Sequence, residues 1–120
     1  MKDYTLVFGA SLKPERYSHK AVLALREKSK KVFAFGLQSG NIADVEIKTE
    51  LLDYEDVETV TLYVNPKRQK EYYNYILSLN PRRVIFNPGT ENKEFEELLS
   101  SKGVFFEVAC TLVLLATNQY

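Results

Sequence analysis

Short apolar segments alternate with amphipathic segments along the chain, and the two kinds have different periods. The apolar segments are rich in β-branched and aromatic residues and are bounded by glycine, proline or asparagine, as buried strands are. The amphipathic segments place apolar residues three or four positions apart, which predicts helices with one buried face. The predicted strands are 4–9, 31–36, 58–65, 82–89 and 104–108, and the predicted helices are 18–28, 66–80, 92–103 and 109–117.

Two segments of this pattern leave an alternative open. Residues 45–51 alternate apolar and polar positions, which predicts either an exposed edge strand or an extended arm. Residues 109–117 form a short apolar run that suits either a terminal helix or a further strand. We expect a helix there, because the other crossovers of the chain are helical.

The alternation of strands and helices also predicts how the strands pair. Strands separated by helices pair in parallel through right-handed crossovers. We therefore expect an α/β fold, a single domain over residues 1–120 with a Rossmann-like, doubly wound, five-stranded parallel sheet between two helical layers. The expected strand order is 3-2-1-4-5. Ligands of such sheets bind beside the carboxyl ends of the strands where the order reverses, here between the first strand and strand 58–65.

Composition excludes several classes of protein. Sixteen basic residues balance sixteen acidic residues, whereas proteins that bind nucleic acid usually carry a basic excess, so no nucleic-acid partner is expected. Cys110 is the only cysteine, which rules out an intrachain disulfide and fits a reducing, cytoplasmic location. No apolar run is long enough to cross a membrane, and the N-terminus has no apolar signal core.

The loop after the first strand is the candidate for chemistry. Gly9 allows a sharp turn, Ala10 and Ser11 leave their amides accessible, and a helix begins shortly afterwards. The free amides and positive dipole of a helix N-terminus favour an anion, and Lys13 and Arg16 add positive charge. These features suit a pyrophosphate. A surface loop with a turn glycine and a capping serine explains them equally well.

The residues after the second strand separate the candidate nucleotides. An NAD site usually places Asp or Glu there to hold the ribose 2′-hydroxyl. The segment 34–40 reads AFGLQSG and contains no acid. This argues against NAD and leaves room for a ligand with a phosphate on its adenosine ribose.

The segment 7–18, VFGASLKPERYS, resembles the signature G-A-S-x-x-P-x-R-x-S of the small CoA-binding proteins. These are single Rossmann-like domains, akin to the nucleotide-binding domain of the succinyl-CoA synthetase α subunit. Segments 56–66 and 87–110 also resemble the family, so the likeness covers essentially the whole chain. The chain departs from the family at Phe35–Gly36, where an asparagine-proline pair is common, and at Asn87–Pro88–Gly89, where glutamine often precedes the glycine turn.

The resemblance implies that the ligand is coenzyme A or an acyl-CoA, and it implies a role for each matching residue. The backbone of 9–11 would hold the pyrophosphate, and Arg16 would pair with phosphate. Ser18 would cap the helix or contact phosphate. Further residues would flank adenine (Gly36, Leu37), line the wall beside the switch point (Val64, Asn65, Pro66) or follow the pantetheine arm (Asn87, Gly89). The implied cofactor-binding residues are Gly9, Ala10, Ser11, Pro14, Arg16, Ser18, Gly36, Leu37, Val64, Asn65, Pro66, Asn87 and Gly89.

Other reactive residues carry a plainer interpretation. His19 stands without metal-ligand neighbours and is expected at the surface. Cys110 lies in an apolar run and is expected to be a small buried residue, with a mixed disulfide to CoA as the alternative. Tyr72, Tyr73 and Tyr75 suit packing on the sheet or, alternatively, a homodimer surface.

No catalytic constellation is visible in the sequence. The phosphorylated histidine of succinyl-CoA synthetase belongs to a second domain that has no counterpart here. We therefore interpret the chain as a binding module without catalysis of its own. The alternatives are an NAD(P)-binding redox protein or sensor of the same fold, and an interaction domain without a ligand.

Overall fold

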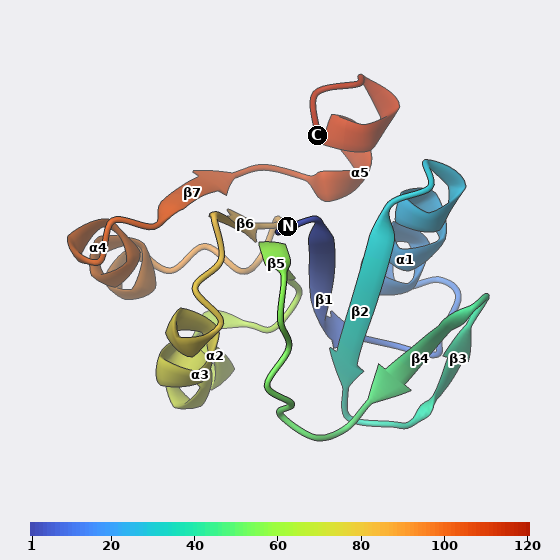
Figure 1. The fold of residues 1–120 in the computed structure, drawn as a ribbon, viewed down its shortest axis with the longest axis horizontal. Helices are drawn as coiled ribbons and strands as arrows, with labels where there is room; N and C mark the ends of the chain where they lie inside the picture. Colours follow the sequence, from blue (N-terminus) through green and yellow to red (C-terminus); the bar gives the residue numbers. More distant parts are fainter.

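The computed structural model describes residues 1–120 and contains one sheet with helices on both faces (Figure 1). The seven strands have the order β3-β4-β2-β1-β5-β6-β7. The strands are β1 Tyr4–Ala10, β2 Lys31–Gly36, β3 Gly40–Ile42, β4 Val45–Lys48, β5 Val57–Leu62, β6 Arg83–Phe86 and β7 Phe105–Val108. The helices are α1 Tyr17–Glu27, α2 Pro66–Gln69, the 3₁₀ turn η1 Lys70–Tyr72, α3 Tyr73–Ser78, α4 Lys93–Ser101 and α5 Thr111–Ala116.

The structure confirms the Rossmann-like α/β class but not the strand count. The five predicted strands are present and pair in parallel in the order β2-β1-β5-β6-β7. The expected order 3-2-1-4-5 is therefore obtained only when β4 is counted as the third strand, whereas the reversal between β1 and β5 is as expected. The sheet has two further strands because β3 and β4 form an antiparallel hairpin, and β4 also pairs with β2. The segment 45–51, expected as an exposed edge strand or an extended arm, contains strand β4, but β4 is not at the edge of the sheet, because β3 pairs with its outer side. Strand β3 has three residues, too few to show an alternating pattern.

Alternation along the central strand β1 divides the core into two clusters. Leu6 and Phe8 point to one face, where they pack with Ile76 of α3 and Phe95 of α4. Val7 points to the other face and packs with residues of α1 and α5. The terminal helix expected within 109–117 is present as α5. No helix is both long enough and apolar enough to cross a membrane.

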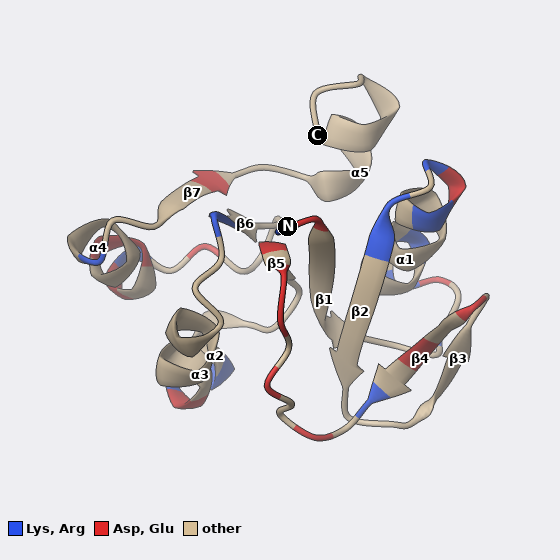
Figure 2. Cartoon of the chain, viewed as in Figure 1, with Lys and Arg blue, Asp and Glu red and all other residues tan.

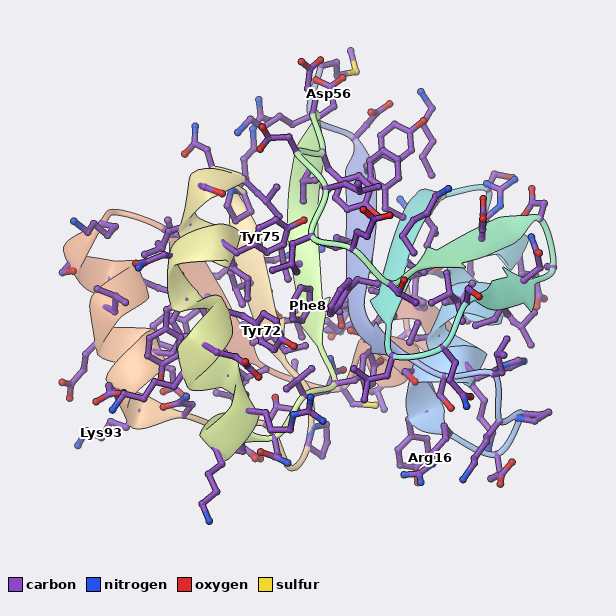
Figure 3. The ribbon with its side chains drawn as sticks, turned by 90° about the horizontal axis from the view of Figure 1, so that it is seen from below. Phe8, Arg16, Asp56, Tyr72, Tyr75 and Lys93 are labelled. Atoms are coloured by element: carbon purple, nitrogen blue, oxygen red, sulfur yellow. The ribbon has the colours of Figure 1, made fainter.

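The helix predicted over residues 66–80 is interrupted. Pro66 starts α2 as expected, but η1 separates it from α3. The tyrosines of this segment pack inward: Tyr72 lies edge-on to Phe8 with ring centroids 5.0 Å apart, and Tyr73 stacks on Phe95 at 4.4 Å. Figure 3 shows Phe8, Tyr72 and Tyr75 gathered between the sheet and this helical segment. These tyrosines thus belong to the packing of the helix on the sheet.

A buried polar network joins β5, β6 and α5 through Asn87. Its amide nitrogen donates to the Thr61 hydroxyl at 2.6 Å and to the Leu62 carbonyl at 2.9 Å. Its amide oxygen accepts from the Thr111 backbone amide at 2.9 Å. Asn87 is only 2% exposed, so water cannot replace these partners.

We expect Asn87→Ala to lower the free energy of unfolding by about 3 kcal/mol, because it leaves buried donors and acceptors without partners. The measurement is urea denaturation followed by circular dichroism. Asn74→Ala removes an exposed amide from α3 and is the matched control, with an expected change below about 0.5 kcal/mol. Equal effects of the two substitutions would contradict this role of Asn87.

Candidate functional site

A cavity of about 730 Å³ opens at the carboxyl ends of β1, β2 and β5, at the switch point of the sheet. It is bounded by the loop from β1 to α1, by the end of β2 and by the start of α2. A volume of this size is within the range of small-molecule sites. Most of the residues expected at the site line it: Gly9, Ala10, Ser11, Arg16, Ser18, Gly36, Leu37, Val64 and Asn65.

Two glycines of the cavity lining allow neighbouring backbone segments to approach one another closely. Gly9 has φ +106°, and a Cβ there would lie 3.1 Å from the Tyr63 carbonyl carbon and from the Val64 side chain. At Gly36 a Cβ would lie 2.3 Å from the Ala10 carbonyl oxygen, which is inside van der Waals contact. At Phe35–Gly36, where the chain departs from the family pattern, it has a glycine at position 36. The close approach of β1 and β2 leaves no room for a side chain there.

The N-terminus of α1 faces the cavity without a cap. Arg16 occupies the N-cap position, and no side chain accepts a hydrogen bond from the first turn. In contrast, Asn65 caps α2 and Asn92 caps α4 through their side chains. The capping role expected for Ser18 is wrong, because Ser18 lies inside the helix, where it is buried at the cavity wall. The free amides of α1 are thus left for a ligand.

Two hydrogen bonds hold the loop before α1 in shape. The Ser11 hydroxyl oxygen accepts from the Lys13 backbone amide at 3.1 Å, which leaves the hydroxyl proton available to donate. The His19 ring nitrogen Nδ1 lies 2.8 Å from the Ser11 carbonyl oxygen, to which it donates. His19 is therefore not simply a surface residue, since it is half-buried and ties the first turn of α1 to the loop.

The charged residues that line the cavity are all basic: Lys13, Arg16 and Arg68. Neither guanidinium is in an ion pair within the protein. Figure 2 shows acidic residues spread along the connection from β4 to β5, which does not line the cavity. A chain of zero net charge thus presents a locally positive site, and such a site favours an anionic ligand.

Several expected residues lie outside the cavity lining. Pro66 begins α2, and Asn87 is held in the buried network described above. Pro14 and Gly89 do not reach the cavity either, whereas Pro88 does. Cys110 is half-buried rather than buried, and it also lies outside the lining, so a mixed disulfide with a ligand there has no support.

Arg68 and Tyr63 line the cavity but were not among the expected site residues. Arg68 belongs to the short basic segment 65–70. The sequence does carry a signal that places Arg68 near the site. Arg68 lies on the first turn after Pro66, and this turn directly follows a strand that ends at the switch point. Tyr63 contributes an uncharged hydroxyl to the wall, and burial raises the pKa of its phenol to about 12.

Together these features define a Rossmann-like protein with a cavity at its switch point whose charged lining residues are all basic. The family described as CoA binding domain matches residues 4–116, and the chain belongs to this family.

Solved structures share the fold of this chain. A crystal structure of an uncharacterized protein is 42% identical with a TM-score of 0.95, covering 100% of this chain and 99% of that one. A hypothetical protein from Pyrococcus horikoshii OT3 is 28% identical with a TM-score of 0.77, covering 90% and 75% of the two chains. A protein from Thermus thermophilus is 24% identical with a TM-score of 0.85, covering 99% and 91%, and supports the fold. No curated protein matches the chain.

We expect Gly36→Ala to lower the free energy of unfolding by about 3 kcal/mol, because the new methyl group meets the Ala10 carbonyl and forces β1 and β2 apart. Gly103→Ala is the control. Its Cβ meets nothing within 4 Å, so only the cost of its φ of +74° remains, about 1 kcal/mol. Urea denaturation measures both variants. A smaller loss for Gly36→Ala than for Gly103→Ala would contradict the close approach.

We also expect the free energy of unfolding to fall as the pH rises from 10 to 12. In this interval the folded protein keeps the Tyr63 proton, because burial raises the pKa of Tyr63 from 10.0 to about 12, whereas the unfolded chain releases it. The stabilisation is complete below pH 10 and is lost as the pH rises. Tyr63→Phe should make the fall shallower, and the control Tyr17→Phe, at an exposed site, should not. Denaturation at several pH values gives the slopes.

Proposed function

We propose that the chain binds coenzyme A or an acyl-CoA in the cavity at the switch point. The observation that carries the proposal is the uncapped N-terminus of α1, which opens into a cavity whose charged lining residues are all basic. Membership of the CoA-binding family supports CoA as the source of the anionic groups.

In this proposal the pyrophosphate lies against the loop at Ala10 and Ser11 and the free amides of α1. Arg16 pairs with phosphate, since its guanidinium has no partner in the protein and can present two parallel donors. Figure 3 shows the Arg16 side chain at the open end of α1. This arrangement binds phosphate oxygens through both backbone and side-chain donors.

The adenosine half lies at the end of β2 in the proposed complex. Gly36 and the exposed Leu37 line the cavity there, and Gln38 is the polar residue beside them. No carboxylate is present to repel a phosphate on the ribose, which supports CoA over NAD. Phe35 stacks on Phe8 with centroids 4.7 Å apart, so its ring is held within the core and leaves the cavity open.

The pantetheine arm extends toward β5 and α2 in this proposal. Val64 and Asn65 line that part, and Pro88 takes the place that the sequence suggested for Asn87 and Gly89. Pro14, Pro66 and Asn87 are proposed to shape the loops rather than to touch the ligand. We propose a binding module without its own catalysis that acts in the cytoplasm.

We expect Arg16→Gln to weaken CoA binding by about tenfold to a hundredfold, because one charge-assisted contact to phosphate is lost. Isothermal titration calorimetry with CoA, 3′-dephospho-CoA, NADH and NADPH measures the affinities.

Arg82→Gln is the matched control, since Arg82 is exposed just before β6 and does not line the cavity. Its CoA affinity should equal that of the unmodified protein. Absence of heat with CoA at millimolar ligand, or tight binding of NADH or NADPH without CoA, would overturn the proposal.

A further inference from the structure

Arg68 is a third cation of the cavity, and it stands on a different wall from Lys13 and Arg16. The loop that carries Lys13 and Arg16 leads into α1, which packs on one face of the sheet. Arg68 belongs to α2, which follows β5 and leads into α3 on the opposite face. Figure 1 shows α1 and the α2–α3 segment on opposite sides of the central strands. The cavity therefore has positive charge at two separate places.

The backbone that carries Arg68 is anchored on both sides. The Arg68 amide donates to the Asn65 side chain at 3.0 Å. The next residue, Gln69, is 1% exposed, and its amide nitrogen donates to the carbonyls of Val64 and Thr90, each at 2.8 Å. Its amide oxygen accepts from Asn92 at 2.9 Å. These bonds fix the backbone of Arg68 beside the cavity. Less conformational entropy is therefore lost when its side chain contacts a ligand.

The Arg68 guanidinium, in contrast, has no partner in the protein. No carboxylate lies within ion-pair distance of it, and none of its side-chain nitrogens donates a hydrogen bond. Arg83 on β6, by comparison, is paired with Glu107 at 3.4 Å. An anchored arginine with free donors at a cavity is suited to a carboxylate or phosphate of a ligand.

The wall beside Arg68 is mainly apolar or neutral. Val64, Tyr72, Pro88 and the uncharged phenol of Tyr63 line it. A ligand that reaches from the loop before α1 to Arg68 must therefore combine a strongly anionic end, a neutral middle and a second anionic group. The pantetheine arm of CoA is such a neutral middle.

We infer that Arg68 recognises a carboxylate at the acyl end of the ligand, so that the site prefers CoA thioesters of dicarboxylic acids. This inference rests on the proposed function, since it takes the phosphates to lie at α1. The competing assignment is a contact between Arg68 and a phosphate of CoA itself. The two assignments differ in which affinities fall when Arg68 is substituted. A contact with the acyl carboxylate affects only the dicarboxylic thioesters, whereas a contact with a phosphate affects every CoA species.

The test uses calorimetry on the full chain with two matched pairs of ligands. Malonyl-CoA differs from acetyl-CoA by a carboxylate, and succinyl-CoA differs from butyryl-CoA by replacing a terminal methyl with a carboxylate. Free CoA and 3′-dephospho-CoA complete the series. Arg68→Gln is compared with Lys67→Gln, which removes a positive charge from the same short helix at an exposed position outside the cavity lining.

The unmodified protein should bind the dicarboxylic member of at least one pair about tenfold more tightly. Arg68→Gln should abolish this preference and leave the affinity for free CoA within twofold, whereas Lys67→Gln should keep the preference. Absence of any preference, or an equal loss for all CoA species in Arg68→Gln, would overturn the inference while leaving CoA binding established. Failure of every CoA species to bind would overturn both this inference and the proposed function.

Discussion

The close approach of β1 and β2 at their carboxyl ends is the constraint on which the rest of the site depends. The Ala10 carbonyl occupies the space that a side chain at residue 36 would need, and Gly9 turns the chain against the backbone of Tyr63. Because no Cβ is present at either position, the end of β1 can pack directly against the end of β2 and against the backbone that follows β5. The first amides of α1 are then presented to the cavity rather than to a neighbouring side chain.

Charge at this site is a matter of placement rather than of composition. The chain as a whole is neutral, yet its cavity is lined by two arginines and a lysine and by no acid. The acidic residues between β4 and β5 balance this charge elsewhere on the molecule. An anionic ligand responds to the local field within about a Debye length, ~8 Å at physiological salt, so the net charge says little about this binding site.

Two buried side-chain amides, those of Asn87 and Gln69, hold the loops around the cavity but do not line it themselves. Asn87 connects β5, β6 and α5, and Gln69 connects the start of α2 with the loop before α4. Each side-chain amide forms hydrogen bonds with backbone N–H or C=O groups of these loops. The segments that carry Val64, Arg68 and Pro88 are therefore positioned by hydrogen bonds that are buried or partly buried. The resulting walls are set before a ligand arrives, which reduces the cost of binding.

The sequence by itself determined the α/β class, the five parallel strands, the switch point and the loop from Gly9 to Arg16, because periodicity and local turn chemistry depend on neighbouring residues. Only the tertiary structure decided the three-residue strand β3, the break at η1, the place of Ser18 inside α1 and the burial of Asn87. It also brought Arg68 to the cavity. These features depend on pairing and hydrogen bonds between residues far apart in the chain, and such contacts leave no periodic trace in the sequence.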